Sequence, residues 1–325
     1  MNLIKISLLV AFFTFVALLD AVGAESDISK KKIAYIVSDI RIPFWHIMSR
    51  GIKNSALELG YEVSFYSSEN IKKTEIENTI KAIKNRVDAI ILSPINSSSA
   101  VTILKFAKSA NIPVVISDIG TDEGEYISFI SSDNEDGAYK IGQVLAKKMQ
   151  ELGWDKNGSV GIVSIPQKRA NGKARTAGFM KAMKESNIKV GGLKQQVNFS
   201  YKETYDFSKE LIKEHKNLRA IWLQGSDRYK AALDAIKDTG KEKDILLIVF
   251  DAEPEFLELI PKGIITGAAM QQPYVFGENA VLVLDDFFNK KDVKKHIQLS
   301  ILPISTENIE KNKLLIKRNV LGMLK

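Results

Sequence analysis

The chain has 325 residues, 45% of them hydrophobic, and a formal net charge of +7 at pH 7. A chain of this size and composition buries a substantial core, so disorder is excluded and about two domains are expected. It contains no cysteine, which excludes a disulfide framework, a thiol nucleophile and a thiolate metal site. The lysines are spread through every predicted helix, so the charge predicts a solvated surface and no nucleic-acid partner.

Residues 1–24 have the pattern of a secretory signal peptide. They contain a basic Lys5, an apolar run over 6–19 and a small-residue ending at Ala24, and we expect cleavage near Ala24. A membrane anchor is the weaker alternative, because the apolar run is short for a membrane span and no second run follows. No cysteine is present for lipid attachment at the cleavage site, so we expect a soluble protein of the bacterial periplasm.

From Lys32 onward, short apolar runs rich in β-branched residues alternate with amphipathic segments. Continuous runs of this kind suit strands that are buried on both faces, and the alternation predicts an α/β fold with parallel sheets and helical crossovers. The predicted strands are 33–37, 62–66, 89–93, 114–117, 159–165, 220–224, 245–250 and 264–270. They form two series, 32–132 and 159–270, without a Pro- or Gly-rich linker between them.

The segments between the strands carry helix signals. Apolar residues recur at helical spacing from 44 to 59, with Pro43 suited to the opening turn and Gly60 to the stop. In the next segment Thr74 precedes Glu77 by three residues, which predicts a capping box at the helix start. The apolar face expected there consists of Ile76, Ile80 and Ile83.

Polar residues follow most of the predicted strands, and open parallel sheets bind ligands at that edge. Asp118 and Asp251 each come directly after an apolar strand, where a carboxylate is costly unless it is paired or offered to a ligand. The alternative for each is a helix N-cap. Arg175 lies in ANGKARTAGF, where Gly172 can relax a turn and the guanidinium can donate to hydroxyls or a carboxylate; the alternative is a surface arginine.

The sequence lacks the motifs of most enzyme classes. The histidines are His46, His215 and His296, and none belongs to a metal-ligand pair. No G-x-S-x-G, G-x-x-x-x-G-K-[ST] or G-x-G-x-x-G motif follows a predicted strand. We therefore predict a protein that is not an enzyme and needs no cofactor or metal, although catalysis by Asp118 and Asp251 alone stays open.

Several segments match one known family in order. They read KIAYIVSDIRIPFWHIMSRGIKNSALELGYEV, VDAIILSPINSSSAV, ANIPVVISD, YISFISSDNEDGAYKIG, ARTAGF, LIVFDAEP and AAMQQP. Together they span essentially the whole mature chain, which resembles the type I periplasmic sugar-binding proteins, typified by ribose-binding protein. The ligand domains of LacI-type repressors share this core, but those proteins begin with a DNA-binding helix-turn-helix where this chain has its predicted signal peptide.

The resemblance implies two doubly wound, parallel-sheet lobes joined by three crossings, which close on a ligand like a hinged trap. The N-terminal lobe is expected to comprise 30–132 and 272–300, and the C-terminal lobe 133–271 and 301–325. Phe44 and Trp45 match the aromatic residues that sandwich the sugar ring, although Phe44 could instead pack under its helix. The full set of implied ligand-binding residues is Phe44, Trp45, Asp118, Arg175, Phe199, Asp251 and Gln271.

The chain departs from the ribose-type pattern at three positions. Ile42, Ile119 and Gly225 stand where ribose-type members usually have Asn, Arg and Asn. Each lost polar group removes roughly 1–3 kcal/mol if its partner stays buried. The pattern therefore disfavours ribose and favours a less hydroxylated ligand, or one that depends more on Arg175 and the aromatic residues.

The resemblance predicts a periplasmic solute-binding protein that captures a small polar ligand, a sugar or sugar-like compound, between its lobes. It would deliver this ligand to an ABC importer as a monomer. The alternative is a sensory binding protein, similar to autoinducer-2 or osmolyte receptors, which reports to a membrane histidine kinase. Autoinducer-2 and osmolyte receptors of this fold likewise have a tryptophan at the position of Trp45.

Overall fold

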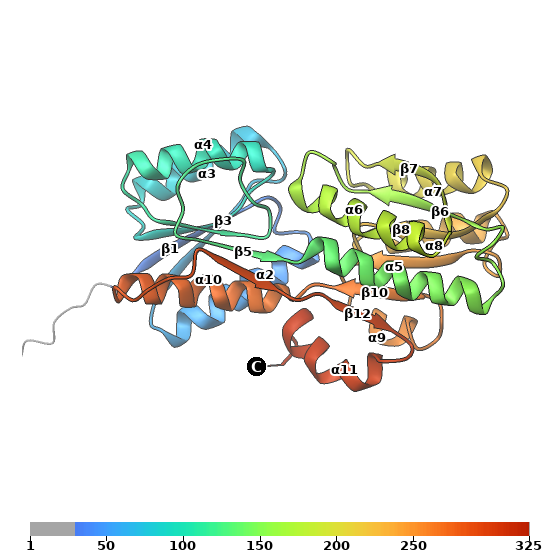
Figure 1. Ribbon diagram of the computed structural model, residues 1–325. Helices are drawn as coiled ribbons and strands as arrows, with labels where there is room; N and C mark the ends of the chain where they lie inside the picture. Colours follow the sequence, from blue (N-terminus) through green and yellow to red (C-terminus); the bar gives the residue numbers. More distant parts are fainter. Residues whose placement is uncertain (1–29, 325) are drawn as a thin grey trace, which may run out of the picture. The chain divides into compact units, whose positions relative to one another are not determined.

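The computed structural model describes residues 30–324, which contain two six-stranded sheets with helices on both faces of each (Figure 1). The predicted signal peptide, 1–24, lies outside these residues. Across residues 30–324 we find no helix with the length and hydrophobicity that a membrane span requires.

The first sheet has the order β11-β5-β4-β3-β1-β2, and all its strands are parallel. Its strands are β1 (Lys32–Val37), β2 (Glu62–Ser67), β3 (Ala89–Ser93), β4 (Val114–Ser117), β5 (Ser128–Ser132) and β11 (His296–Leu299). Its helices are α2 (Pro43–Glu58), α3 (Lys72–Lys84), α4 (Ser97–Ser109) and α10 (Pro273–Phe288).

Alternate residues of β1 explain how the helices are distributed over this sheet. Tyr35 and Val37 belong to one buried cluster with residues of α2 and α10, whereas Ala34 and Ile36 belong to another with residues of α4. Successive strand residues point to opposite faces, so a continuous apolar run supplies a core on both sides. Figure 1 shows α3 and α4 above the sheet and α2 and α10 below it.

The second sheet has the order β12-β10-β9-β8-β6-β7, with only the edge strand β12 antiparallel to its neighbour. Its strands are β6 (Ser159–Ser164), β7 (Lys189–Gln195), β8 (Leu218–Leu223), β9 (Leu246–Phe250), β10 (Gly267–Met270) and β12 (Leu302–Ser305). Its helices are α5 (Asn134–Glu151), α6 (Ala170–Glu185), α7 (Tyr201–Glu214), α8 (Tyr229–Asp238), α9 (Phe256–Leu259) and α11 (Ile309–Leu315), followed by the π-helical turn η1 (Ile316–Val320).

Three short connections join the two sheets. The chain passes from β5 to α5, from β10 to α10, and from β11 to β12. Helix α10 therefore follows the second sheet in sequence but packs against α2 beneath the first. The predicted α/β class, with two doubly wound lobes and three crossings, is confirmed, while the exact lobe boundaries stay a prediction.

All eight predicted strands are present, with ends that differ by at most three residues. Strands β5, β7, β11 and β12 were not predicted from apolar runs. The predicted capping box at Thr74 is wrong, because α3 begins at Lys72 after Ile71, which makes no side-chain capping bond. The expected apolar face is also partly wrong, since Ile80 is exposed and Glu75 is buried.

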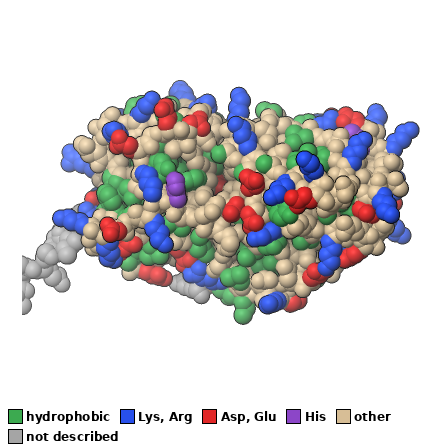
Figure 2. All heavy atoms as spheres, in the orientation of Figure 1, with side chains coloured by type: hydrophobic (Ala, Val, Ile, Leu, Met, Phe, Trp, Pro, Cys, Tyr) green, Lys and Arg blue, Asp and Glu red, His purple; other side chains and the backbone are tan. Residues whose placement is uncertain are grey.

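Charged side chains are mixed on the face of the protein in Figure 2. Blue Lys and Arg side chains lie among red Asp and Glu side chains across this face, without one concentrated basic area. This distribution agrees with a solvated surface as the source of the net positive charge.

Each lobe contains a pair of helices whose backbones touch at a glycine. A Cβ atom on Gly51 of α2 would lie 2.2 Å from the carbonyl oxygen of Tyr274 in α10. A Cβ atom on Gly178 of α6 would lie 2.0 Å from the carbonyl oxygen of Glu135 in α5. Because the obstacle is backbone in both cases, neither contact can be relieved by a side-chain rotation.

We expect Gly51→Ala to lower the free energy of unfolding by about 1–3 kcal/mol or more, because the new methyl group must push α2 and α10 apart. Denaturant titration of the purified protein measures this change. The exposed Lys53→Ala on the same helix is the control and should stay within about 0.5 kcal/mol of the parent. Equal stability of Gly51→Ala and the parent would contradict this helix contact.

Candidate functional site

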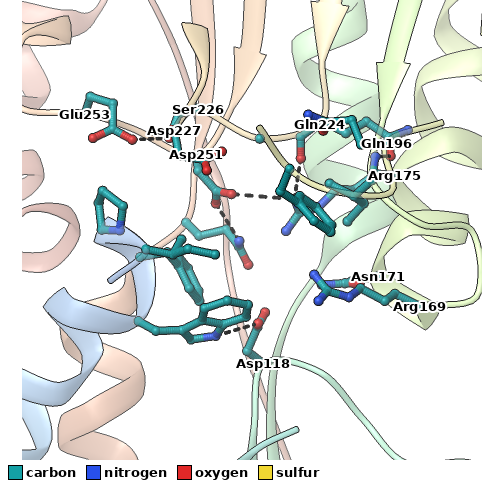
Figure 3. A pocket seen from close by; sticks show the side chains of 18 residues that line it. Asp118, Arg169, Asn171, Arg175, Gln196, Gln224, Ser226, Asp227, Asp251 and Glu253 are labelled. Atoms are coloured by element: carbon teal, nitrogen blue, oxygen red, sulfur yellow. Dashed lines mark hydrogen bonds and ion pairs between the residues drawn. The ribbon is translucent and has the colours of Figure 1, made fainter. Parts of the chain in front are cut away.

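A cavity of about 70 Å³ lies where loops at the carboxyl ends of both sheets meet. Each sheet has its first five strands in the order 2-1-3-4-5 of a doubly wound fold, which places a ligand crevice at these strand ends. The cavity is lined by every residue that the resemblance implies: Phe44, Trp45, Asp118, Arg175, Phe199, Asp251 and Gln271. Figure 3 shows the cavity with the labelled polar side chains around it.

Three of these residues have a strained backbone. Asp118, Asp251 and Phe199 have φ values of +74°, +70° and +52°, in the left-handed region that non-glycine residues seldom adopt. Neither aspartate is a helix N-cap, so that alternative is excluded for both. Backbone strain of this kind concentrates at ligand sites, where the surrounding structure holds it in place.

Asp118 follows β4 and is tied to the aromatic pair. The indole Nε1 of Trp45 donates to its carboxylate Oδ2 at 3.2 Å. Burial raises the pKa of Asp118 to about 6, and the nearby guanidinium of Arg175 opposes this shift. The carboxylate is thus held by one neutral donor and keeps capacity to accept further hydrogen bonds.

Arg175 is a buried residue on α6 and not a surface arginine, since only 3% of it is exposed. Its guanidinium donates to the Asn134 side chain at 2.8 Å and to the Gln224 carbonyl at 2.7 Å. It also lies 3.5 Å from a carboxylate oxygen of Asp251 and stacks on the ring of Phe250. Burial lowers the pKa of Arg175 and raises that of Asp251, while their mutual attraction opposes both shifts.

Gln271 links Asp251 to the end of β10. Its amide Nε2 donates to the Asp251 carboxylate at 2.6 Å. Gln271 is only 2% exposed, and within residues 30–324 its buried carbonyl oxygen Oε1 has no hydrogen-bond partner. A buried acceptor without a partner is costly, so this oxygen has unused capacity for a donor placed in the cavity.

Phe44 and Trp45 pack in the core and also line the cavity. Trp45 is 4% exposed and belongs to the buried cluster under the first sheet. Phe44 is half-buried and meets both Trp45 and Phe276 edge-on, with ring centroids 6.3 Å and 6.0 Å away. Both side chains therefore pack in the core of the first lobe and also form part of the cavity wall.

Phe199 is fixed by its backbone. Its N–H donates to Glu203 at 2.9 Å, and its carbonyl accepts from the Arg228 guanidinium at 2.9 Å. These two bonds hold the left-handed conformation and aim the ring at the cavity. The resemblance named Phe199 as a ligand-binding residue, but it did not indicate Glu203 and Arg228, which hold its backbone.

Arg169 lines the cavity and was not predicted. Its guanidinium carbon lies 5.2 Å from the ring centroid of Phe199 and 5.9 Å from that of Trp45, so one cation contacts aromatic rings from both lobes. Burial lowers its pKa to about 10. The signal in the sequence was its place six residues before Arg175 in a polar loop, which did not distinguish it from Lys168.

Polar residues after β8 and β9 were also missed. Ser226, Asp227 and Glu253 line the same cavity as Asp251. The Ser226 hydroxyl donates to the Glu253 carboxylate at 2.8 Å, and burial raises the pKa of Glu253 to about 7. Their signal was their position two or three residues after predicted strand ends, similar to the criterion that identified Asp251.

The three departures from the ribose-type pattern differ in their relation to the cavity. Ile42 and Gly225 line it, so these two substitutions replace polar groups at the site itself. Ile119 does not belong to the lining and packs in the core beneath the first sheet. Ile119 therefore gives no reason to disfavour ribose, whereas Ile42 and Gly225 still do.

The buried Glu253 predicts a pH-dependent stability. Its pKa rises from 4.5 to about 7 on folding, so its contribution to stability is present below pH 4.5 and is lost as the pH rises through 7. Glu253→Gln keeps the acceptor for Ser226 but cannot ionise. We expect it to raise the free energy of unfolding at pH 8 by about 1–3 kcal/mol, and to match the parent near pH 4.5.

Denaturant titrations of parent and variant across this pH range, without added ligand, measure the difference. The exposed Glu255→Gln serves as the control and should show no comparable gain at pH 8. A constant difference between Glu253→Gln and the parent at all pH values would contradict the raised pKa.

Comparisons with known proteins agree with this architecture. A profile of the periplasmic binding protein domain matches residues 33–292. The ribose import binding protein of Escherichia coli is 27% identical over 294 residues, which cover 90% of this chain and 96% of that protein. The ribose import binding protein of Bacillus subtilis is 26% identical over 266 residues, covering 82% and 84%.

Solved structures share the fold. A carbohydrate transporter solute binding protein from Agrobacterium radiobacter, in complex with D-arabinose, aligns with a TM-score of 0.82 and 20% identity, covering 90% of this chain and 100% of that one. A periplasmic solute binding protein from Actinobacillus succinogenes with bound D-allose aligns with a TM-score of 0.79 and 20% identity, covering 87% and 100%. With two doubly wound lobes and a polar cavity at their strand ends, the chain belongs to the periplasmic binding protein domain family.

Proposed function

We propose that the protein captures a small sugar-like ligand in the cavity between its two sheets and delivers it to an ABC importer. The observation that carries this proposal is the lining of the cavity. Aromatic side chains and carboxylates from both lobes, together with guanidinium and amide groups from the second lobe, meet around one space. Relatives named as ribose import binding proteins support a carbohydrate ligand and a role in import.

The chemistry of the lining suits a sugar ring. Such rings have apolar faces and hydrogen-bonding edges, so they need flat aromatic surfaces beside fixed donors and acceptors. Trp45 and Phe199 supply rings from opposite lobes, and Asp118, Asp251 and Gln271 supply acceptors. We assign these residues, with Phe44 and Arg175, to ligand binding.

The position of Arg169 implies that this side chain moves on ligand binding. Arg169 contacts both Trp45 and Phe199, so its guanidinium lies where a stacked ring would need access. We infer that Arg169 moves toward the cavity edge as the ligand enters and the lobes close around it.

The side chains that line the cavity restrict which ligands fit. Ile42 and Gly225 provide no polar side chain, and a hydroxyl facing them would lose its hydrogen bond. Ribose is therefore not the preferred ligand in this proposal. A ligand with an apolar edge toward Ile42 and donors toward Asp251 fits better.

We further propose that the protein is exported, with residues 1–24 removed, and acts as a monomer without a nucleic-acid partner. A sensory role with a membrane histidine kinase was the alternative from the sequence. No observation on the described residues or in the named relatives favours it, so import is the function that we propose.

The proposal also excludes turnover of the ligand. Mass spectrometry of the small molecules released by denaturing the purified protein should identify a carbohydrate. After prolonged incubation with fresh protein, the same compound should be recovered unchanged. Release of no carbohydrate by a folded protein that also binds none from a sugar panel would overturn the function, and a new product that Asp118→Asn abolishes would establish an enzyme.

Substitutions at two tryptophans distinguish ligand contact from core packing. Trp45→Phe should weaken ligand affinity roughly five- to thirtyfold, because it shortens the stacking face and removes the hydrogen bond to Asp118, a loss of about 1–2 kcal/mol. Trp222→Phe alters a fully buried tryptophan that does not line the cavity. It should lower the melting temperature and leave affinity within twofold. Calorimetric titration with the copurified ligand, alongside thermal melts, measures both quantities.

If Trp45→Phe binds as tightly as the parent and only melts earlier, Trp45 acts in the core alone. The assignment of the aromatic pair to the ligand site would then be wrong.

A further inference from the structure

Glu253 is a buried carboxylate at one end of the cavity. It lies three residues after β9, is 8% exposed and lines the cavity. Within the described part of the chain, the only hydrogen bond to its side-chain carboxylate comes from the Ser226 hydroxyl, at 2.8 Å. A buried carboxylate has four lone-pair positions, so a single neutral donor leaves most of its acceptor capacity unused.

The other three carboxylates of the lining each have a guanidinium close by. The neighbours are Arg175 for Asp251 at 3.5 Å, Arg228 for Asp227 at 3.0 Å, and Arg175 and Arg169 for Asp118, whose charges act on it through space. Within residues 30–324 Glu253 forms no ion pair, and the charges that act on it are those of Asp227, Glu255 and Asp251. Glu253 is therefore the one carboxylate of this lining whose charge the described chain leaves uncompensated.

A second observation at the same cavity points to a missing donor. Among the residues that the structure describes, the buried carbonyl oxygen of Gln271 has no hydrogen-bond partner, and the carboxylate Oδ2 of Asp227 accepts no hydrogen bond despite its ion pair. Both atoms belong to residues that line the cavity with Glu253. Figure 3 shows Asp227 and Glu253 together on the opposite side of the cavity from Arg169. One side of the cavity is thus rich in acceptors and poor in donors.

We propose that Glu253 binds a cationic amino group of the ligand, so that the protein selects an amine-bearing sugar or sugar alcohol over its neutral counterpart. This inference rests on the proposed function and names the ligand class of the same site. An ammonium group brings a positive charge and three donors, which match an uncompensated carboxylate beside further free acceptors. A neutral hydroxyl brings one donor and leaves the charge uncompensated.

The electrostatics of the site support this assignment. Burial, followed by the neighbouring acidic groups Asp227, Glu255 and Asp251, raises the pKa of Glu253. A cation placed beside Glu253 offsets this repulsion, because it attracts the carboxylates of Glu253, Asp227 and Asp251 that line the cavity. The preference for a cation would arise because the protein without ligand keeps the buried charge of Glu253 uncompensated, which is unfavourable.

The experiment is calorimetric titration at pH 7 with matched pairs of sugars. The probes are D-glucose, D-galactose and D-ribose, each beside its amino-deoxy derivatives at the available ring and exocyclic positions. In the parent protein, at least one amino sugar should bind ten times or more tightly than its neutral counterpart. Glu253→Gln, which keeps size and the Ser226 bond, should reduce that preference to about twofold or less.

Glu255→Gln is the matched control, since Glu255 is an exposed acidic residue two positions further on and pairs with Lys230 outside the cavity. It should keep the parent's preference for the amine. Tighter or equal binding of the neutral sugars by the parent, or an amine preference that survives in Glu253→Gln, would overturn the inference while leaving the sugar-binding function in place. Binding of no sugar by folded parent protein would overturn both.

Discussion

The buried guanidinium of Arg175 organises the ligand end of the second sheet. From α6 it reaches the first residue of α5, the carbonyl that follows β8 and the carboxylate that follows β9. A charge this deep is tolerated only when its donors are satisfied and a counter-charge lies near. The positions of Asn134, Gln224 and Asp251 are thereby fixed relative to one another, and the ligand cavity inherits that geometry.

The charge of the cavity differs in sign from the charge of the whole chain. The sequence carries a net charge of +7, yet four carboxylates and two guanidinium groups line the cavity. Surface lysines are hydrated and screened, so they set solubility and long-range attraction more than ligand choice. Inside the cavity, the carboxylates and guanidinium groups interact at short range with little water between them. Each charge therefore acts strongly on its neighbours and on any group that enters the cavity.

Much of the fold follows from local pattern, because a strand buried on both faces must be continuously apolar. The strands that escaped this criterion have a physical reason to do so. β7 contains two glycines and lies at a sheet edge, β11 and β12 are four-residue edge strands, and β5 is rich in serine. Similarly, α3 begins without a side-chain cap because its N-cap residue is the apolar Ile71. Its buried Glu75 accepts a hydrogen bond from the backbone N–H of Ile95 in the loop after β3.

The local pattern of residues along the chain specifies the alternation of strands and helices, and it positions Asp118 and Asp251 at strand ends, where parallel sheets bind ligands. Tertiary structure alone decided which side chains share the cavity and which charges are compensated. Arg169 and Glu253 resemble ordinary surface residues in the sequence, because their burial depends on segments far away in the chain. Only when loops from both sheets converge does one become a cation between two aromatic rings and the other a carboxylate without a counter-charge.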